Sequence, residues 1–301
     1  MPRTQLLVGT RKGAFVLESD DDRRTWDIRG PYCESWPVYH VVRDGASGSI
    51  YAAAASEWHG SAVWRSFDEG ETWALSSEGL KYEGANGEGR KVSKVSTLAV
   101  VGDKVLVGAE APVMFETGDG GSTWTPTNRG LRADWPREHE EVGFCVHKVV
   151  RSPDPLRMYQ QNHVGMHRSD DGGHSWTEIT EGLPSEFGFA AAAHPHDRDT
   201  FYVIPLDPGH ARCMPDGAAA VWRTQNGGEN WQRLDAGLPQ RNAHLGVLRA
   251  AMAIDKQDVP GLYFGTSTGQ IFASADEGES WNEIASYLPP VWSVEVATIA
   301  A

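Results

Sequence analysis

Short runs of apolar and β-branched residues alternate with turn-forming residues along the chain. The first runs lie at 6–10, 14–18 and 25–28, and Gly, Asp or Arg-rich polar residues separate them. Four more follow at 37–43, 49–54, 62–65 and 72–75. Runs of this length, rich in Val, Ile, Tyr and Trp, are typical of β-strands joined by tight turns. The pattern therefore predicts an all-β protein.

The predicted strands fall into groups of four. Comparable quartets begin near Val95, Gly143, Phe187 and Leu245, whereas the first group has only three strands. The run at 291–297 has no group of its own and would complete the first one. Closing a ring in this way removes the open sheet edges.

We therefore predict a single domain, 1–301, folded as a six-bladed β-propeller of four-stranded antiparallel blades. The C-terminal strand joins the N-terminal blade and closes the ring. The approximate blade boundaries are 1–30 plus 291–299, 36–78, 94–127, 143–181, 187–236 and 245–285.

One motif, S/T-x-D-x-G-x-S/T-W, recurs about every 50 residues. Its acidic position is held by Asp21, Asp68, Asp119, Asp171, Asn226 and Asp276. Its tryptophan is Trp26, Trp73, Trp124, Trp176, Trp231 or Trp281. The first copy has Arg23 in place of Gly, and the fifth has Asn226 in place of Asp. Asp and Ser/Thr side chains bind turn backbone, and Gly supplies a positive φ, so we predict a structural hairpin turn.

These turns resemble the Asp-box (BNR) repeats of sialidases and related β-propellers. The chain as a whole is similar to small bacterial proteins described as sialidase-like or glycosyl hydrolase-like. The segments 145–150, 159–163 and 289–295 contribute to this likeness. The resemblance implies that the boxes lie on one rim, away from the functional site, and that their role is structural.

Composition narrows the partners and the location. The chain has a net charge of −14, which argues against nucleic acid or an anionic membrane surface as a partner. No apolar run is long enough for a membrane span. Three scattered cysteines and a start that lacks a secretory signal favour a soluble cytoplasmic protein.

The residue two positions before each box is expected to pack between sheets. It is Leu17, Trp64, Phe115, His167, Trp222 or Phe272. His167 breaks the apolar pattern, and we expect it to be partly exposed. The sequence His194-Pro195-His196-Asp197 suggests a turn rather than a metal chelate, because it occupies the same place as 151–154 in the preceding group.

Candidate site residues gather on the rim opposite the boxes or on the innermost strands. We predict a catalytic centre of His147, His163, Glu110 and Glu295. The predicted ligand-binding residues are Arg11, Glu57, His59, Asn162, His244, Arg249 and His40. One carboxylate or imidazole would act as a general base on water while Arg or a bound cation stabilises negative charge.

Three functions remain open at this point. The first is a hydrolase acting on a small or glycan-like substrate, although the residues at 8–13 lack the Arg-Ile-Pro segment familiar in sialidases, which argues against neuraminidase activity. The second is a metal-dependent lactonase-like hydrolase with an ion in the central channel, for which no firm ligand set or cofactor is defined. The third is a non-catalytic module that binds a small molecule or glycan, or that serves assembly. The sequence leaves the oligomeric state open.

Overall fold

The structure is a computed structural model that describes most of the chain. The described residues are 3–20, 22–56, 60–76, 97–101, 104–108, 115–116, 125–126, 129–132, 146–209 and 211–299. Their regular structure is β-strand, with two single turns of 3-10 helix, η1 (Cys33–Ser35) and η2 (Pro215–Gly217). None of these residues belongs to a helix that is long and apolar enough to cross a membrane.

The chain divides into two compact units. One consists of 1–110, 264–272 and 283–301, and the other of 111–263 and 273–282.

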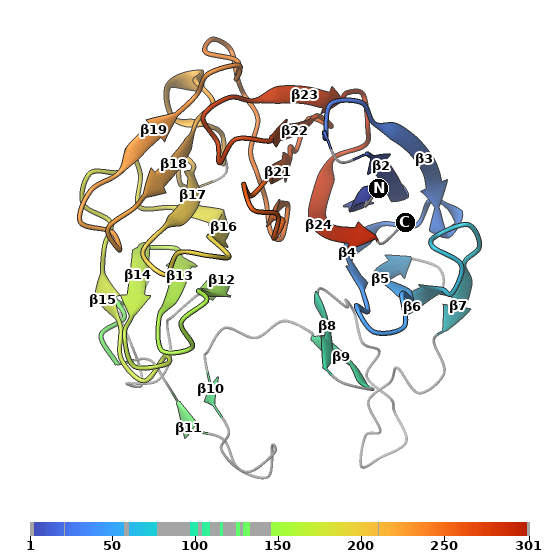
Figure 1. Ribbon diagram of the computed structural model, residues 1–301, viewed down its shortest axis with the longest axis horizontal. Coiled ribbons are helices and arrows are strands. Elements are labelled where there is room, and N and C mark those ends of the chain that lie inside the picture. The colour runs from blue at the N-terminus through green and yellow to red at the C-terminus, as the bar shows by residue number, and fades with distance from the viewer. Residues whose placement is uncertain are drawn as a thin grey trace. The chain divides into compact units, whose positions relative to one another are not determined.

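The N- and C-terminal strands of the chain share one sheet of the first unit. Its order is β24 (Val291–Ile299), β1 (Arg3–Thr10), β2 (Gly13–Ser19) and β3 (Asp27–Tyr32). Leu7 pairs with Glu295 and Val8 with Val294 in the antiparallel register. In Figure 1 the red β24 lies beside the dark blue strands of the N-terminus. The predicted pairing of the C-terminal strand with the first blade is confirmed.

A second four-stranded sheet follows in the same unit. It contains β4 (Val38–Arg43), β5 (Ile50–Ser56), β6 (Gly60–Ser66) and β7 (Ala74–Ser76). Leu7 and Val16 of the first sheet form one buried cluster with Val38, Val41 and Trp64 of the second. Trp64 holds the position two residues before a box, so the predicted packing role is confirmed there.

The second unit contains two more sheets of the same kind. One has β12 (Val146–Arg151), β13 (Met158–Asn162), β14 (Gly165–Ser169) and β15 (Thr177–Glu178). The other has β16 (Gly188–Ala193), β17 (Phe201–Pro205), β18 (Val221–Thr224) and β19 (Gln232–Leu234). Tyr159 and Phe201 stack between them with ring centroids 4.4 Å apart and both side chains fully buried.

A fifth sheet contains β20 (Met252–Ile254), β21 (Leu262–Gly265), β22 (Ile271–Ser274) and β23 (Asn282–Ala285). Two short ladders complete the described strands. They are β8 (Thr97–Val101) with β9 (Lys104–Gly108), and β10 (Phe115–Glu116) with β11 (Thr125–Pro126). Five four-stranded antiparallel sheets with paired terminal strands give the propeller-like architecture that the repeat predicts, while the count of six blades stays a prediction.

The innermost strand of the last sheet begins later than predicted. The sequence suggested a start near Leu245, but β20 begins at Met252. The intervening segment packs against the loop before η2 instead, because the amide of Met214 donates to the carbonyl of Leu245 over 2.9 Å. Gly246 permits this contact, since an added Cβ would lie 2.2 Å from the carbonyl oxygen of Arg212.

The boxes form the predicted turns between the third and fourth strands of their sheets. In the copy at 169–176, the Ser169 hydroxyl donates to Asp171 over 2.8 Å and accepts the Gly173 amide over 2.8 Å. The Ser175 hydroxyl and amide also donate to Asp171. These bonds, chiefly the one from the Ser175 hydroxyl, lower the pKa of Asp171 to about 2. The copies containing Asp68 and Asp276 repeat the same four bonds.

The imperfect boxes keep the turn with fewer bonds. The side-chain oxygen of Asn226 accepts hydrogen bonds from the Thr224 hydroxyl and the Asn230 main-chain amide. An Asn side chain has only this one oxygen, whereas the Asp of the other boxes has two. Arg23 takes the left-handed conformation of the missing Gly, with φ +56°. The Trp26 indole donates to the Arg23 carbonyl, as the Trp73 indole does to Gly70. Asp21, Asp119 and Trp124 lie outside the described residues.

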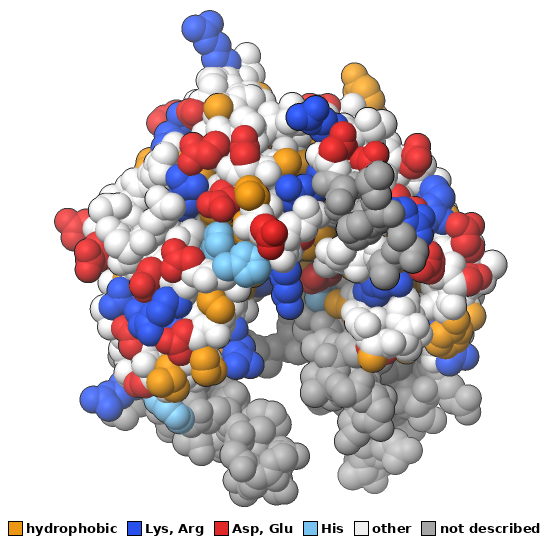
Figure 2. Space-filling model, viewed as in Figure 1, with side chains coloured by type: hydrophobic (Ala, Val, Ile, Leu, Met, Phe, Trp, Pro, Cys, Tyr) orange, Lys and Arg blue, Asp and Glu red, His pale blue; other side chains and the backbone are white. Residues whose placement is uncertain are grey.

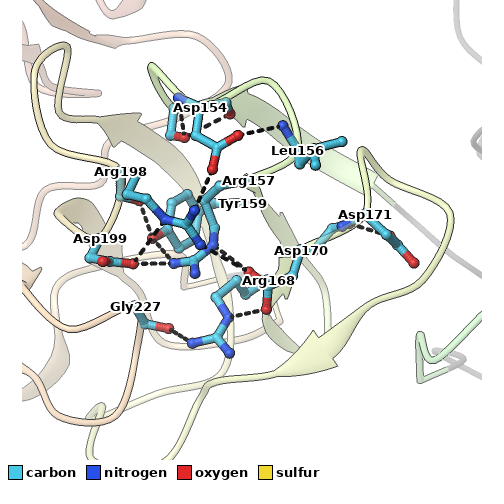
Figure 3. Close-up of polar contacts among 12 residues, drawn as sticks. Asp154, Leu156, Arg157, Tyr159, Arg168, Asp170, Asp171, Arg198, Asp199 and Gly227 are labelled. Atoms are coloured by element: carbon cyan, nitrogen blue, oxygen red, sulfur yellow. Dashed lines mark hydrogen bonds and ion pairs between the residues drawn. The ribbon is translucent and has the colours of Figure 1, made fainter.

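Buried arginines join the box ends of neighbouring sheets in the second unit (Figure 3). Arg157 bonds to Asp170 in its own sheet and to Asp199 in the next, and its side chain is only 7% exposed. Arg168, directly before one box, donates to the Gly227 carbonyl in the following box over 2.8 Å. Arg223 makes the equivalent bond to the Glu277 carbonyl over 3.3 Å.

The turn that follows the last strand of a sheet, here called the exit turn, bonds to the tryptophan of the next box through the main chain at two described places. In the second unit, the Trp176 amide donates to the Arg129 carbonyl and the Trp281 amide to the Ala236 carbonyl, both over 2.9 Å. Gly237 follows Ala236 with φ +90°. An added Cβ there would lie 2.1 Å from the Trp281 carbonyl oxygen. The exit turn therefore requires Gly for its backbone conformation and for the close approach.

His167 is fully buried, so the expectation of partial exposure was wrong. It holds the same repeat position as Trp64 and Trp222. Neither of its ring nitrogens has a hydrogen-bond partner among the described residues. Burial lowers its pKa to about 4, and the positive charge of Arg132 adds to this effect. His167 is thus a neutral imidazole in an apolar position. The segment 194–197 is the predicted turn, because the Nδ1 atom of His194 accepts the amides of His196 and Asp197.

We predict that Gly237→Ala lowers the free energy of unfolding by about 3 kcal/mol, because it combines a left-handed alanine with a clash against Trp281. Gly209→Ala is the matched control, since Gly209 has φ +79° but no atom within 4 Å of an added Cβ. It should cost only about 1 kcal/mol. Urea unfolding measures both, and equal losses would show that the close approach is unimportant.

We predict that His167→Phe preserves or raises stability at pH 7 by about 1 kcal/mol, because it removes two buried unpaired nitrogens. The pKa of His167 is about 4 in the folded chain, below the ordinary value of 6.5. The contribution of His167 to the free energy of unfolding therefore falls as the pH drops below 6.5. Wild type should lose about 2 kcal/mol relative to the variant between pH 7 and pH 5. Unfolding curves at both pH values test this, and a parallel loss in both proteins would contradict it.

Candidate functional site

The structure separates the predicted site residues into two groups. Glu57, His59 and Glu110 lie outside the described residues. His147, His163, Asn162 and Arg249 belong to the second unit. His40 and Glu295 belong to the first unit, where they form a pair.

His147 and His163 are in direct contact. His147 lies on β12, and His163 follows β13 in the turn before β14. Their ring centroids are 4.5 Å apart, with the rings nearly perpendicular. The ring of Phe189 stacks on His147 at 4.2 Å, and Phe187 approaches both imidazoles within 5.6 Å. Two imidazoles thus lie against an aromatic wall from β16 and the residue before it.

The protonation state of His147 follows from these surroundings. Its Nδ1 atom lies 2.5 Å from the Gly188 carbonyl oxygen, so Nδ1 carries the proton and donates it to that oxygen. Burial, together with the positive charges of Arg212 and Arg249, lowers the pKa of His147 to about 4. His147 is therefore neutral at pH 7, with the lone pair on Nε2.

Two arginines supply positive charge at this cluster. The guanidinium of Arg212 lies over the Phe189 ring, 5.3 Å from its centroid. Arg249 was predicted and Arg212 was not. Both have left-handed backbones, with φ +46° and +54°. Such conformations are costly for a long side chain and concentrate at functional sites.

Buried amides lie behind the cluster. Gln161 and Asn162 are fully buried. The Asn162 side-chain oxygen accepts the Val164 amide over 2.8 Å, and its Nδ2 atom has no partner among the described residues. The Gln161 side-chain oxygen, also unpartnered in this part of the structure, would lie 3.1 Å from a Cβ added to Gly188. Asn162 therefore shapes the turn that carries His163.

The pair in the first unit differs in character. The Nε2 atom of His40 lies 3.1 Å from a carboxylate oxygen of Glu295, which comes from β24. The imidazole is 8% exposed and the carboxylate 37% exposed. Beside them, Tyr39 and Trp292 stack with ring centroids 4.8 Å apart. The carboxylate is the accessible group, and the imidazole holds it in place from behind.

The remaining predicted residues lie apart from both groups. Arg11 is exposed in the turn between β1 and β2, and its amide donates to the Pro290 carbonyl. His244 is exposed beside η2, 3.7 Å from a Cβ added to Gly217. Within the described ranges, no three His, Cys, Asp or Glu side chains are arranged to hold a metal ion.

Charges of both signs share the surface around these groups. On the face drawn in Figure 2, acidic and basic side chains of the described residues are interspersed rather than separated.

Comparisons with known proteins define the fold class only. No family model matches the chain, and no curated protein matches its sequence significantly. A GH74 enzyme from Niastella koreensis is 17% identical, with a TM-score of 0.47 over 93% of this chain and 43% of that one. YCF48 bound to D1 peptide is 16% identical, with a TM-score of 0.41 over 92% and 77% of the two chains.

TolB from Acinetobacter baumannii is 9% identical, with a TM-score of 0.51 over 98% of this chain and 66% of that one. The chain spans less than half the length of the Niastella enzyme, because the match covers 43% of that enzyme. At such identities a structural likeness supports the fold alone.

We predict that His147 stays neutral and keeps its proton on Nδ1 from pH 8 down to about pH 5, because burial and two arginines hold its pKa near 4. Nitrogen-15 NMR of the imidazole rings measures both properties. Free imidazole in the same buffer serves as the control. A His147 signal that titrates together with free imidazole would contradict the prediction.

Proposed function

We propose that this protein binds a small anionic molecule that carries a ring, such as an acidic sugar, at the His147–Phe189–Arg212 cluster of the second unit. The contact of Phe189 with both a neutral imidazole and a guanidinium carries this proposal. Each component has a distinct role in recognition.

Arg212 would hold the acidic group of the ligand, because a guanidinium binds carboxylate or sulfate through two parallel hydrogen bonds. The Nε2 lone pair of His147 would accept a hydrogen bond from a ligand hydroxyl. Phe189, which is partly exposed, offers an apolar surface for the ring, and few polar groups on an apolar surface are typical of small-molecule sites.

Binding fits this cluster better than hydrolysis does. A general base works best with a pKa near the working pH, and the pKa of His147 is about 4. Glycoside hydrolysis usually needs two carboxylates. Among the described residues, the groups that contact His147 or shift its pKa include no carboxylate. Two imidazoles also fall short of the three protein ligands of a typical catalytic zinc site.

Hydrolysis is the second candidate and would use the first unit. There, the 37% exposed carboxylate of Glu295 lies against the buried imidazole of His40. A carboxylate held in this way suits general acid or base chemistry. This pair retains the predicted role of Glu295 without requiring a metal.

The test of the proposal is isothermal titration with glucuronate and with glucose. We expect wild type to prefer glucuronate, and Arg212→Gln to weaken its binding about tenfold, because a charge-assisted pair is lost. Arg241→Gln is the matched control, since this exposed arginine on a nearby loop carries the same charge. Its affinity should stay within about twofold of wild type.

Equal binding of glucuronate and glucose, or equal losses in the two variants, would contradict the proposal. The same proteins are assayed for release of 4-nitrophenol from aryl glycosides. Turnover that Glu295→Gln abolishes and Arg212→Gln leaves intact would favour hydrolysis at the pair with His40.

A further inference from the structure

A cavity of about 190 Å³ lies in the second unit, and its lining includes neither His147 nor Phe189 nor Arg212. Three prolines, Pro184, Pro205 and Pro215, line it together with Trp222. Asp216 and Arg233 are its charged residues. We propose that this cavity binds a small organic amine with a compact apolar body and one positive charge.

The lining sets the size and shape of the ligand. Proline rings have little conformational freedom, so these walls are rigid. Trp222 is partly buried and packs against the core cluster that contains Tyr159 and Phe201, which fixes its ring. An apolar cavity of about 150 Å³ accommodates benzene. The cavity thus has room for one six-membered ring.

The charges select a cation. Arg233 bonds to Asp235, and it also donates to the Gln240 side-chain oxygen over 2.7 Å. Gln240 is fixed in turn by its bond to the Ala219 carbonyl over 2.8 Å. The positive charge of Arg233 is therefore balanced locally. Asp216 has no ion-pair partner among the described residues, so its carboxylate is the uncompensated charge of the lining.

The position of Asp216 is built into the fold. It lies in η2 with φ +56°, a conformation that is unfavourable for a residue with a side chain. Main-chain bonds hold the turn on both sides, from Met214 to Leu245 and from Ala243 to Gly217, each over 2.9 Å. Backbone strain that is held in place beside a cavity is common at ligand sites.

Trp222 completes the recognition of a cation. An ammonium group is attracted to the face of an indole ring, and the attraction grows where water is excluded. A carboxylate and an indole together recognise an amine attached to a ring, whereas a neutral or anionic ring compound gains only the apolar contact. This ligand class is opposite in charge to the one proposed for the His147 cluster, so each proposal can fail independently.

The test follows the Trp222 indole resonance by two-dimensional NMR during titration with benzylamine, benzyl alcohol and benzoate. Trp222→Phe assigns the resonance. We expect benzylamine to shift it saturably, with benzyl alcohol at least about tenfold weaker and benzoate without saturation. Asp216→Asn should weaken benzylamine about tenfold. Asn tolerates a left-handed backbone, so this variant keeps the turn.

Asp258→Asn is the control, because it removes one exposed carboxylate of the same unit at a distance from the cavity lining. Its affinity for benzylamine should stay within about twofold of wild type. The inference is overturned if benzylamine gives no saturable shift, if benzyl alcohol binds equally well, or if Asp216→Asn and Asp258→Asn behave alike. Binding that persists in Arg212→Gln supports a site separate from the His147 cluster.

Discussion

Bonds from the tryptophans of the boxes to the preceding exit turns are the constraint on which the second unit depends, through the main chain at Trp176 and Trp281 and through the indole at Trp231. The outer strands of its sheets are short, two residues in β15 and three in β19. Ladders of that length cannot hold a sheet edge by themselves. The bonds from Trp176 to Arg129 and from Trp281 to Ala236 instead tie each edge to the neighbouring sheet. The box serves to present that tryptophan, which explains why its carboxylate accepts several turn bonds.

Because the box ends are fixed, the opposite ends of the strands can vary. Between β17 and β18 the chain makes a long excursion, and the segment before β20 docks on it instead of joining a sheet. Four non-glycine residues in these two stretches have left-handed backbones, namely Arg212, Asp216, Asn242 and Arg249. Such conformations are uncommon away from glycine. Their concentration in these two stretches is one reason for proposing both binding sites there.

The repeat made most of the fold predictable from sequence. Box turns depend on side chains within eight residues, so Asp68, Asp171 and Asp276 could be assigned with their partners. Strand pairing of the termini followed from counting strands. The start of β20 could not be predicted in this way, because Leu245 and Val247 have strand-like spacing and their burial comes from a loop more than 30 residues earlier.

The candidate site was predictable only in part for the same reason. His147 and His163 stand out as polar residues next to strands, and β12 and β13 are neighbours in sequence. Arg212 lies in an insertion without periodicity, and only the folded chain places it over Phe189. His167 shows the converse error, since a polar residue in an apolar repeat position was expected to be partly exposed. The repeat position decided its burial, and its pKa adjusted instead.

The overall charge adds a last physical argument. A net charge of −14 attracts cations at long range and repels anions, so the same background favours the ligand of one proposed site and opposes the ligand of the other. The amine cavity needs only one uncompensated carboxylate, because the surrounding field has the same sign. The His147 cluster must overcome that field, which requires two arginines and an imidazole kept neutral by burial.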